Sequence, residues 1–319
     1  MQQAVAKKWV VRTIIALNVF VLVLNVIFFT KNAAVRSMHV QGARYTYLSK
    51  RVFAEDPNDV LINFTELRQE LRTYTKPAGD SVSMYFEYLP SGNSVGVNPS
   101  QIFFGASLLK LPVAMKAYKL IEDGKLDKSQ QVTIEPSDID RGFGDLWRRG
   151  AGATLSLDEV LRLSIAQSDN TADKILRRLV KSRPVSDVFD YLDIPTDLKS
   201  EYGAGVTAKG FSSVLRALYL SSYLSSADSN NLLTTMTTSP YNDRIVAGIP
   251  QNVKVAHKVG IYEQPGPATG EVHSDCGIIY IPKRPYMLCI MSTAAIQQST
   301  EYMRTISKMV YDYVSSAEN

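Results

Sequence analysis

The chain has 319 residues, of which 45% are hydrophobic and 21% charged, and this composition is typical of a globular protein with one large or two small domains. Residues 1–36 contain five basic residues and no acidic one, so the remaining 30 of the 35 basic residues are balanced by 31 acidic residues. No basic stripe with interleaved aromatic residues follows, which excludes a nucleic-acid partner.

Residues 13–30 form an uncharged apolar run of 18 residues, TIIALNVFVLVLNVIFFT. As a helix this run would span roughly 27 Å, close to the thickness of a bilayer core. Residues 32–34 make a poor signal-peptidase site, and no cysteine for lipid attachment follows. The run therefore predicts an uncleaved, single-pass transmembrane anchor. Lys7, Lys8 and Arg12 precede it, which predicts that the N-terminus lies on the cytoplasmic side of the membrane and that the chain after the anchor lies on the outer side.

We therefore expect a short cytoplasmic segment at residues 1–12, the anchor at 13–30, a polar stalk at 31–58 and an outward-facing domain at 59–319. Asn18 and Asn25 share one face of the anchor helix. They either hydrogen-bond a second anchor in a weak dimer or, as we favour, are merely tolerated.

The outward-facing domain begins with a predicted helix and a hairpin. Asn63 followed by Glu66 is a capping-box pattern, and a helix from there would end at residues 76–79. Alternating apolar residues predict a strand over 82–88, and a turn leads to a return strand over 95–97.

A block of helices comes next, and the chain then returns to strands. A helix starting near Ser107 should end at Gly124, and Ser156 with Glu159 forms a second capping box. Later helical patterns cover 172–179, 185–192, 208–220 and 306–313, and strands are predicted at 253–259, 276–281 and 286–291. This order predicts an α+β fold, in which strands from both ends of the chain form one antiparallel sheet and the helices form an inserted lobe.

The two cysteines, Cys276 and Cys289, lie in apparent strands on either side of a proline-bounded turn. Their spacing permits a disulfide without requiring one, and we expect two buried free thiols. The three histidines and two cysteines have no zinc-ligand spacing, so we expect no metal and no cofactor.

Ser107 and Lys110 form an SxxK pattern at the start of an apolar helix. Three residues make nearly one helical turn, so the hydroxyl and the amine would share one face. A serine hydroxyl needs a neighbouring base to act as a nucleophile, and a lysine in an apolar setting loses its proton readily. Because serine and lysine are common, chance is the simpler interpretation of this pattern alone.

Two further motifs follow in order: Ser168-Asp169-Asn170, and Lys258-Val259-Gly260 on a predicted strand. Together with SxxK, they resemble the SxxK, SDN and KTG set of the class A β-lactamases and their penicillin-binding relatives. The resemblance covers about residues 60–315 and implies the same fold.

The resemblance also implies roles for the motif residues. Ser107 would attack a carbonyl and become acylated, while Lys110 accepts its proton. Ser168 would relay a proton to the departing nitrogen, and Asn170 would hold the amide side chain of the substrate. Lys258 would place a positive charge at the cleft, which favours the neutral form of the first lysine and attracts an anionic substrate.

Two backbone positions complete the implied site. The N–H groups of Ser107 and Ile261 would form the oxyanion hole, in which one donor is typically worth ~3 kcal/mol in the transition state. Gly260 would let the strand approach the substrate closely, because it carries no side chain.

The first departure from the family pattern concerns the binding of the substrate's carboxylate. Val259 stands where relatives have a hydroxyl residue, and a lost hydrogen bond to a charged group is worth ~1.5–3 kcal/mol. His257 or His273 would be the substitute for the basic residue that binds the carboxylate in relatives, although packed or surface histidines are the simpler interpretation.

The second and larger departure is the absence of the ExxLN element, whose glutamate activates the deacylating water in class A β-lactamases. The corresponding region reads DYLDIPTDLKSEYGAGVTAKG. Asp193, Asp197 and Glu201 are candidate substitutes, although solvated loop acids are the simpler interpretation. Without such a base, acylation would be followed by slow turnover.

The sequence leaves three functions open. The first is a membrane-anchored serine hydrolase acylated by β-lactams or related amides. The second is a penicillin-binding-protein-like D,D-peptidase or transpeptidase, or a sensor that stays acylated, with a peptidoglycan-like partner. The third is a non-catalytic binding module, against which the intact motif residues argue.

Overall fold

The computed structural model describes residues 62–195, 204–262 and 270–316, together with residues 17, 19, 21–23 and 47. Within these residues, no helix combines the length and the apolar character needed to cross a membrane. Most of the predicted anchor, all of the predicted cytoplasmic segment and nearly all of the predicted stalk lie outside the described residues.

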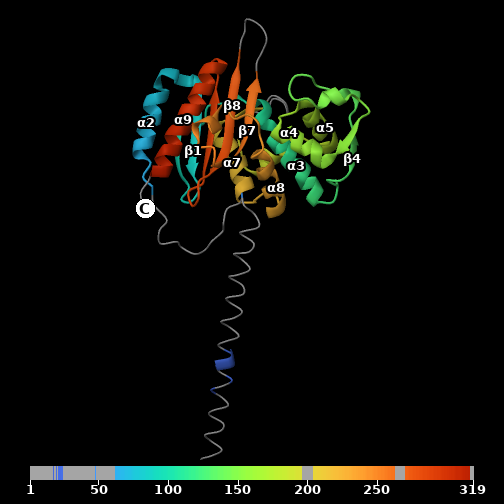
Figure 1. The fold of residues 1–319 in the computed structure, drawn as a ribbon, viewed down its shortest axis with the longest axis horizontal. Coiled ribbons are helices and arrows are strands. Elements are labelled where there is room, and N and C mark those ends of the chain that lie inside the picture. The colour runs from blue at the N-terminus through green and yellow to red at the C-terminus, as the bar shows by residue number, and fades with distance from the viewer. Residues whose placement is uncertain are drawn as a thin grey trace, which may run out of the picture. The chain divides into compact units, whose positions relative to one another are not determined.

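One antiparallel sheet joins the two ends of the domain (Figure 1). Its strand order is β2-β1-β9-β8-β7, so the N-terminal hairpin pairs directly with a C-terminal strand. This confirms the predicted sheet. The strands are β1 (Val82–Tyr88), β2 (Asn93–Val97), β7 (Lys254–Tyr262), β8 (Val272–Tyr280) and β9 (Tyr286–Ser292).

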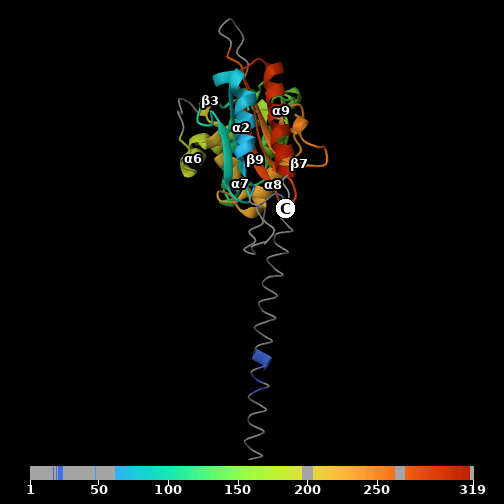
Figure 2. The same ribbon diagram turned by 90° about the vertical axis from the view of Figure 1, so that its left-hand side faces the viewer.

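Two helices, α2 (Thr65–Thr75) and α9 (Ile296–Ser316), lie side by side on one face of the sheet (Figures 1 and 2). Successive side chains of a strand point to opposite faces, and Met84, Phe86 and Tyr88 of β1 all belong to the apolar core beneath these helices. The predicted alternation of β1 therefore sets which face carries the main hydrophobic core.

The chain segment between β2 and β7 forms the helical lobe and two further helices. Within it, the α-helices are α3 (Lys110–Glu122), α4 (Leu157–Ala166), α5 (Asn170–Val180), α6 (Pro184–Tyr191), α7 (Ala208–Tyr219) and α8 (Ser226–Met236). Two small antiparallel pairs join β3 (Phe103–Phe104) to β6 (Gly205–Val206), and β4 (Gln131–Thr133) to β5 (Thr154–Ser156).

Short 3₁₀ helices connect these elements. They are η1 (Lys76–Ser81), η2 (Ala106–Leu109), η3 (Pro136–Asp138), η4 (Leu146–Arg149) and η5 (Ile245–Gly248). The predicted helix at Ser107 therefore has two parts, because its first turn is the 3₁₀ helix η2 and the α-helix begins only at Lys110.

The second face of the sheet packs against α7, and charge is buried there. Arg216 of α7 forms an ion pair with Glu87 of β1, with Nε 2.9 Å from Oε1. Glu87 lies between Phe86 and Tyr88 in sequence and so points away from the apolar core.

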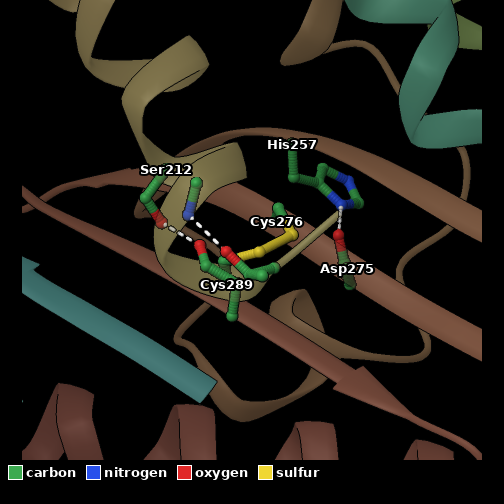
Figure 3. Close-up of a disulfide and its surroundings, with 8 residues drawn as sticks. Ser212, His257, Asp275, Cys276 and Cys289 are labelled. Atoms are coloured by element: carbon green, nitrogen blue, oxygen red, sulfur yellow. Dashed lines mark hydrogen bonds and ion pairs between the residues drawn. A yellow bond between two sulfur atoms is a disulfide. The ribbon is translucent and has the colours of Figure 1, made fainter. Parts of the chain in front are cut away.

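Cys276 and Cys289 form a disulfide on this second face, beside α7 (Figure 3). The expectation of two free thiols was therefore wrong. The two residues are directly opposite each other in the β8–β9 pairing, and side chains at opposed positions of neighbouring strands lie close together. The proline-bounded turn sets this register, which the sequence spacing alone does not reveal.

The two predicted capping boxes have different outcomes. Ser156 accepts a hydrogen bond from the Glu159 N–H at 3.2 Å and caps α4, as predicted. At α2 the N-cap is Phe64, and Asn63 instead accepts from the N–H of Thr65, two residues on. The asparagine thus forms a local turn that ends on the first residue of the helix, where its side chain satisfies a free backbone donor.

Candidate active site

Ser107 lies at the junction between the sheet side of the domain and the helical lobe. It is the second residue of η2, which follows β3 and leads into α3. The preceding Ala106 has a φ of +46°, in the left-handed region that non-glycine residues rarely adopt. This backbone bend precedes the half-buried Ser107 at the wall of a cavity of about 250 Å³.

The Lys110 amine is buried, with 4% of the residue exposed. It donates to the Asn170 Oδ1 at 2.7 Å, to the Ser168 carbonyl, and more weakly to the Ser168 Oγ at 3.4 Å. Burial lowers the pKa of Lys110 to about 8, against the opposing effect of nearby carboxylates. A lysine with this pKa is partly neutral near pH 7, as a base for the serine hydroxyl must be.

The Ser168 hydroxyl contacts both Lys110 and Lys258. Its hydroxyl is fully buried and lies 2.7 Å from the Nζ of Lys258, which reaches it from β7. Lys258 is only 1% exposed, and burial, followed by the charge of Lys110, lowers its pKa well below the usual range. The structure therefore brings Lys110 of SxxK, Ser168 of SDN and Lys258 of β7 together.

The SDN turn is held by Asp169, the N-cap of α5. Its carboxylate accepts from the N–H of Ala172 at 2.9 Å and from that of Leu146 at 2.8 Å. Gly144, with a φ of +84°, passes so close that a Cβ there would lie 2.1 Å from the Asp169 Oδ2. These contacts fix the turn in which Ser168 adopts its own left-handed φ of +56°.

Asn170 is engaged on both sides of its amide. Its oxygen accepts from Lys110, and its Nδ2 donates to the Asp140 Oδ1 at 3.0 Å. Asp140 in turn contacts the Nζ of Lys174 at 3.0 Å. The residue expected to hold the substrate's amide is therefore part of a polar network that also orients the base.

Gly260 and Ile261 lie where β7 passes η2. A Cβ on Gly260 would come within 3.0 Å of the Leu108 Cγ and 3.4 Å of the Gly105 oxygen, so only glycine allows this approach without displacement. Ile261 and Ser107 line the same cavity, which places the two backbone positions of the predicted oxyanion hole at one site. The lining residues are Phe104, Ala106, Ser107, Lys110, Asp140, Asn170, Asp173, Lys174, Arg177 and Ile261.

Helix α5 contributes charged residues to this cavity that the sequence analysis did not single out. Asp173, Lys174 and Arg177 follow Asn170 by three, four and seven residues. These are the spacings that share a helix face, so extending the SDN motif along its helix would have found them.

Neither histidine reaches the cavity. His257 is buried and pairs with the Asp275 Oδ1 at 2.8 Å, on the sheet near the disulfide (Figure 3). His273 contacts Glu271 through Nε2 at 3.1 Å. The packed-histidine interpretation therefore agrees with their surroundings.

Four other residues bear on the departures from the family pattern. Val259 is 1% exposed and is not among the residues that line the Ser107 cavity. Asp193 lines a different cavity, next to Ile102 and Gly205. Asp197 and Glu201 lie outside the described residues.

In the part of the chain that the structure describes, no group of three or more histidine, cysteine or acidic residues is arranged to hold a metal ion.

The fold and the site together define a protein of the serine β-lactamase and penicillin-binding class. Residues 66–314 match the model of the beta-lactamase enzyme family, and the chain belongs to that family.

Among curated relatives, the beta-lactamase regulatory protein BlaB of Streptomyces cacaoi is 32% identical over 117 residues. That alignment covers 36% of this chain and 38% of the relative. The extended-spectrum beta-lactamase PER-1 of Pseudomonas aeruginosa is 24% identical over 244 residues, which are 69% of this chain and 76% of the relative.

Solved structures share the fold. PBP-A superposes with a TM-score of 0.71 at 23% identity, covering 79% of this chain and 97% of PBP-A. The TLA-3 extended-spectrum beta-lactamase gives a TM-score of 0.72 at 20% identity, covering 79% of this chain and 99% of that one.

Proposed function

We propose that this protein is a serine hydrolase that is acylated on Ser107 by β-lactams or related cell-wall-like amides. The observation that carries the proposal is the meeting of Lys110 and Lys258 at the Ser168 hydroxyl, in a polar network that borders the Ser107 cavity. A structural role would not require two buried amines at one hydroxyl, since buried cations are costly unless paired.

The geometry supports the following steps. Lys110, with a pKa of about 8, accepts the Ser107 proton as the hydroxyl oxygen attacks the amide carbonyl. The N–H groups of Ser107 and Ile261 stabilise the oxyanion. The amide C–N bond then breaks. Ser168 passes its proton to the leaving nitrogen, and Lys110 gives Ser168 the proton that it took from Ser107. The product is an ester on Ser107, and Lys258 holds the Ser168 hydroxyl in place during the transfer.

The same proposal includes location. The uncharged run of 18 residues at 13–30, preceded by basic residues, supports a single-pass anchor that leaves the catalytic domain outside the cell membrane. The substrate would then be met outside the cytoplasm, where cell-wall peptides and β-lactams occur.

A second candidate function keeps the acylation and omits rapid release: a D,D-peptidase, a transpeptidase or an acylated sensor. The lack of an ExxLN sequence favours it, and so does the position of Asp193 in a cavity other than that of Ser107. The relatives include proteins named as a regulatory protein and as PBP-A, besides named β-lactamases.

Labelling with a fluorescent penicillin tests the acylation. The folded domain should acquire one label, and Ser107→Ala should acquire none. Ser315→Ala, which removes a hydroxyl from the far end of α9, is the matched control and should label like the parent chain. Equal labelling of Ser107→Ala, or no labelling of a folded parent chain, would overturn the proposal in favour of a binding module.

A further inference from the structure

Asp173 places a carboxylate in the cavity that Ser107 shares with Lys110. It is 7% exposed, so more than nine-tenths of the residue is buried. Its position three residues after Asn170 on α5 puts it on the helix side that carries the amide partner of Lys110.

The two oxygens of this carboxylate differ. Oδ2 accepts from the Nε of Arg177 at 2.9 Å, one helical turn further on. Oδ1 is buried and has no hydrogen-bond partner among the described residues. A buried acceptor without a donor is costly, by about 1–3 kcal/mol, and an ion pair with Arg177 alone does not account for it. Oδ1 can therefore accept a hydrogen bond from a molecule that enters the cavity, and water is such a donor.

The electrostatics of the site place Asp173 near the reacting groups. Among the carboxylates that oppose the burial of Lys110, Asp173 has the largest effect on the pKa of that lysine. It is also the first carboxylate to act on the pKa of Lys258. The negative charge of Asp173 therefore lies close to both amines, beside the serine to be acylated.

We propose that Asp173 is the general base that hydrolyses the acyl-enzyme, in place of the loop glutamate that this chain lacks. This inference rests on the proposed acylation of Ser107. The three motifs contain no residue for the hydrolysis of the acyl-enzyme, and Asp173 would supply it. The base would then lie on α5, the helix that begins at the SDN motif, instead of on a loop.

The hydrolytic step balances as follows. Asp173 Oδ1 takes one proton from a water molecule, and the water oxygen forms a bond to the ester carbon on Ser107. The tetrahedral intermediate then collapses with cleavage of the bond between that carbon and Ser107 Oγ. The proton held by Asp173 returns to Oγ by way of Lys110. A carboxylic acid leaves, and Ser107 and Asp173 are regenerated.

Intact-mass spectrometry over time, after rapid mixing with penicillin G, separates formation of the adduct from its loss. In Asp173→Asn the adduct should persist about 10²–10⁴ times longer than in the parent chain, the usual range for loss of a general base. Formation of the adduct at pH 7 should not slow, because removing this carboxylate lowers the pKa of Lys110 further and increases its neutral form. The two steps should therefore respond in opposite directions.

Two further variants make the test specific. Asp312→Asn removes the acid of another i,i+4 ion pair, with Lys308 on α9, and should change neither step. Asp173→Ala with added formate should regain part of the lost hydrolysis, because formate fits the vacated carboxylate position and can take the proton. This rescue keeps the test decisive if the asparagine variant folds poorly.

Each other outcome has a definite meaning. Unchanged adduct lifetime in Asp173→Asn would overturn the role of Asp173, and so would an equal loss of both steps without formate rescue. A parent chain that forms the adduct and never releases it would overturn the hydrolytic role while leaving acylation intact. A parent chain that never forms the adduct would overturn the proposed function itself.

Discussion

The two faces of the central sheet bury different kinds of side chain. The face under α2 and α9 buries an almost wholly apolar cluster that includes Phe86 and Leu288. The region where the other face meets the helical lobe instead buries the charged residues Lys258, Lys110 and Asp169. Both lysines contact the hydroxyl of Ser168, the residue that precedes Asp169. Burial of apolar side chains on the first face therefore stabilises the fold, whereas holding charged groups out of water at the second face costs part of that stability.

The largest expected effect concerns the charged region. Lys110→Met keeps an unbranched side chain of similar length and removes the base, so acylation of Ser107 should fall by about 10²–10⁴-fold. Thermal unfolding should change little, because the relief of a buried amine offsets the hydrogen-bond donor that Asn170 and the Ser168 carbonyl lose. Stopped-flow labelling with a fluorescent penicillin measures the rate, and a rate within threefold of the parent would contradict the role of Lys110.

On the apolar face, Phe86→Ala should lower stability and leave the acylation rate unchanged. Phe86 is fully buried and packs edge-on against Phe64 at a centroid distance of 5.1 Å. Its truncation should cost about 3–5 kcal/mol of unfolding free energy, measured by urea denaturation. The acylation rate of the molecules that remain folded should not change. A slower rate at full folding would show that the two faces are coupled.

The disulfide gives an intermediate case, because it lies on the charged side of the sheet but makes no bond with the site. Replacing Cys276 and Cys289 by alanine should lower stability by about 2–4 kcal/mol, the usual effect of a disulfide that closes a short loop. In the β7–β8 pairing Cys276 lies opposite Lys258, so acylation kinetics of the folded variant report whether the bridge also positions that lysine. Parent-like kinetics are expected.

The smallest expected effect is the change of the acylation rate with pH. The reactive form of Lys110 is the neutral amine, and its pKa is lowered to about 8. Acylation should therefore rise with pH by nearly tenfold per unit below 7 and level off above about 8. A rate–pH profile from 6 to 9.5 checks this, and a rate that falls across that interval would contradict a neutral lysine base.

Several features of the fold and site could be predicted from local sequence. The strands alternate or run apolar. SxxK and SDN lie where helices begin, and Lys258 lies in the middle of β7, the edge strand of the sheet. The helix α8 was missed because its sequence, SADSNNLLTTM, is rich in polar residues of low helix propensity and is held by its Ser225 cap and its packing.

Other features depend on contacts between distant segments. The disulfide follows from the register of β8 against β9, which spacing does not specify. The role proposed for Asp173 depends on which of its oxygens meets Arg177 and which stays without a partner. Sequence gives the helical face of Asp173, but only packing shows that this face borders the Ser107 cavity.

The measurement that tests the central claim most directly is peptide mapping of the protein after brief exposure to penicillin G. Two buried lysines that meet at Ser168 should direct the acyl group to one hydroxyl, so the adduct is expected on the peptide that contains Ser107 and on no other. An adduct on Ser168 or on a surface residue, or a folded protein without any adduct, would contradict this description of the site.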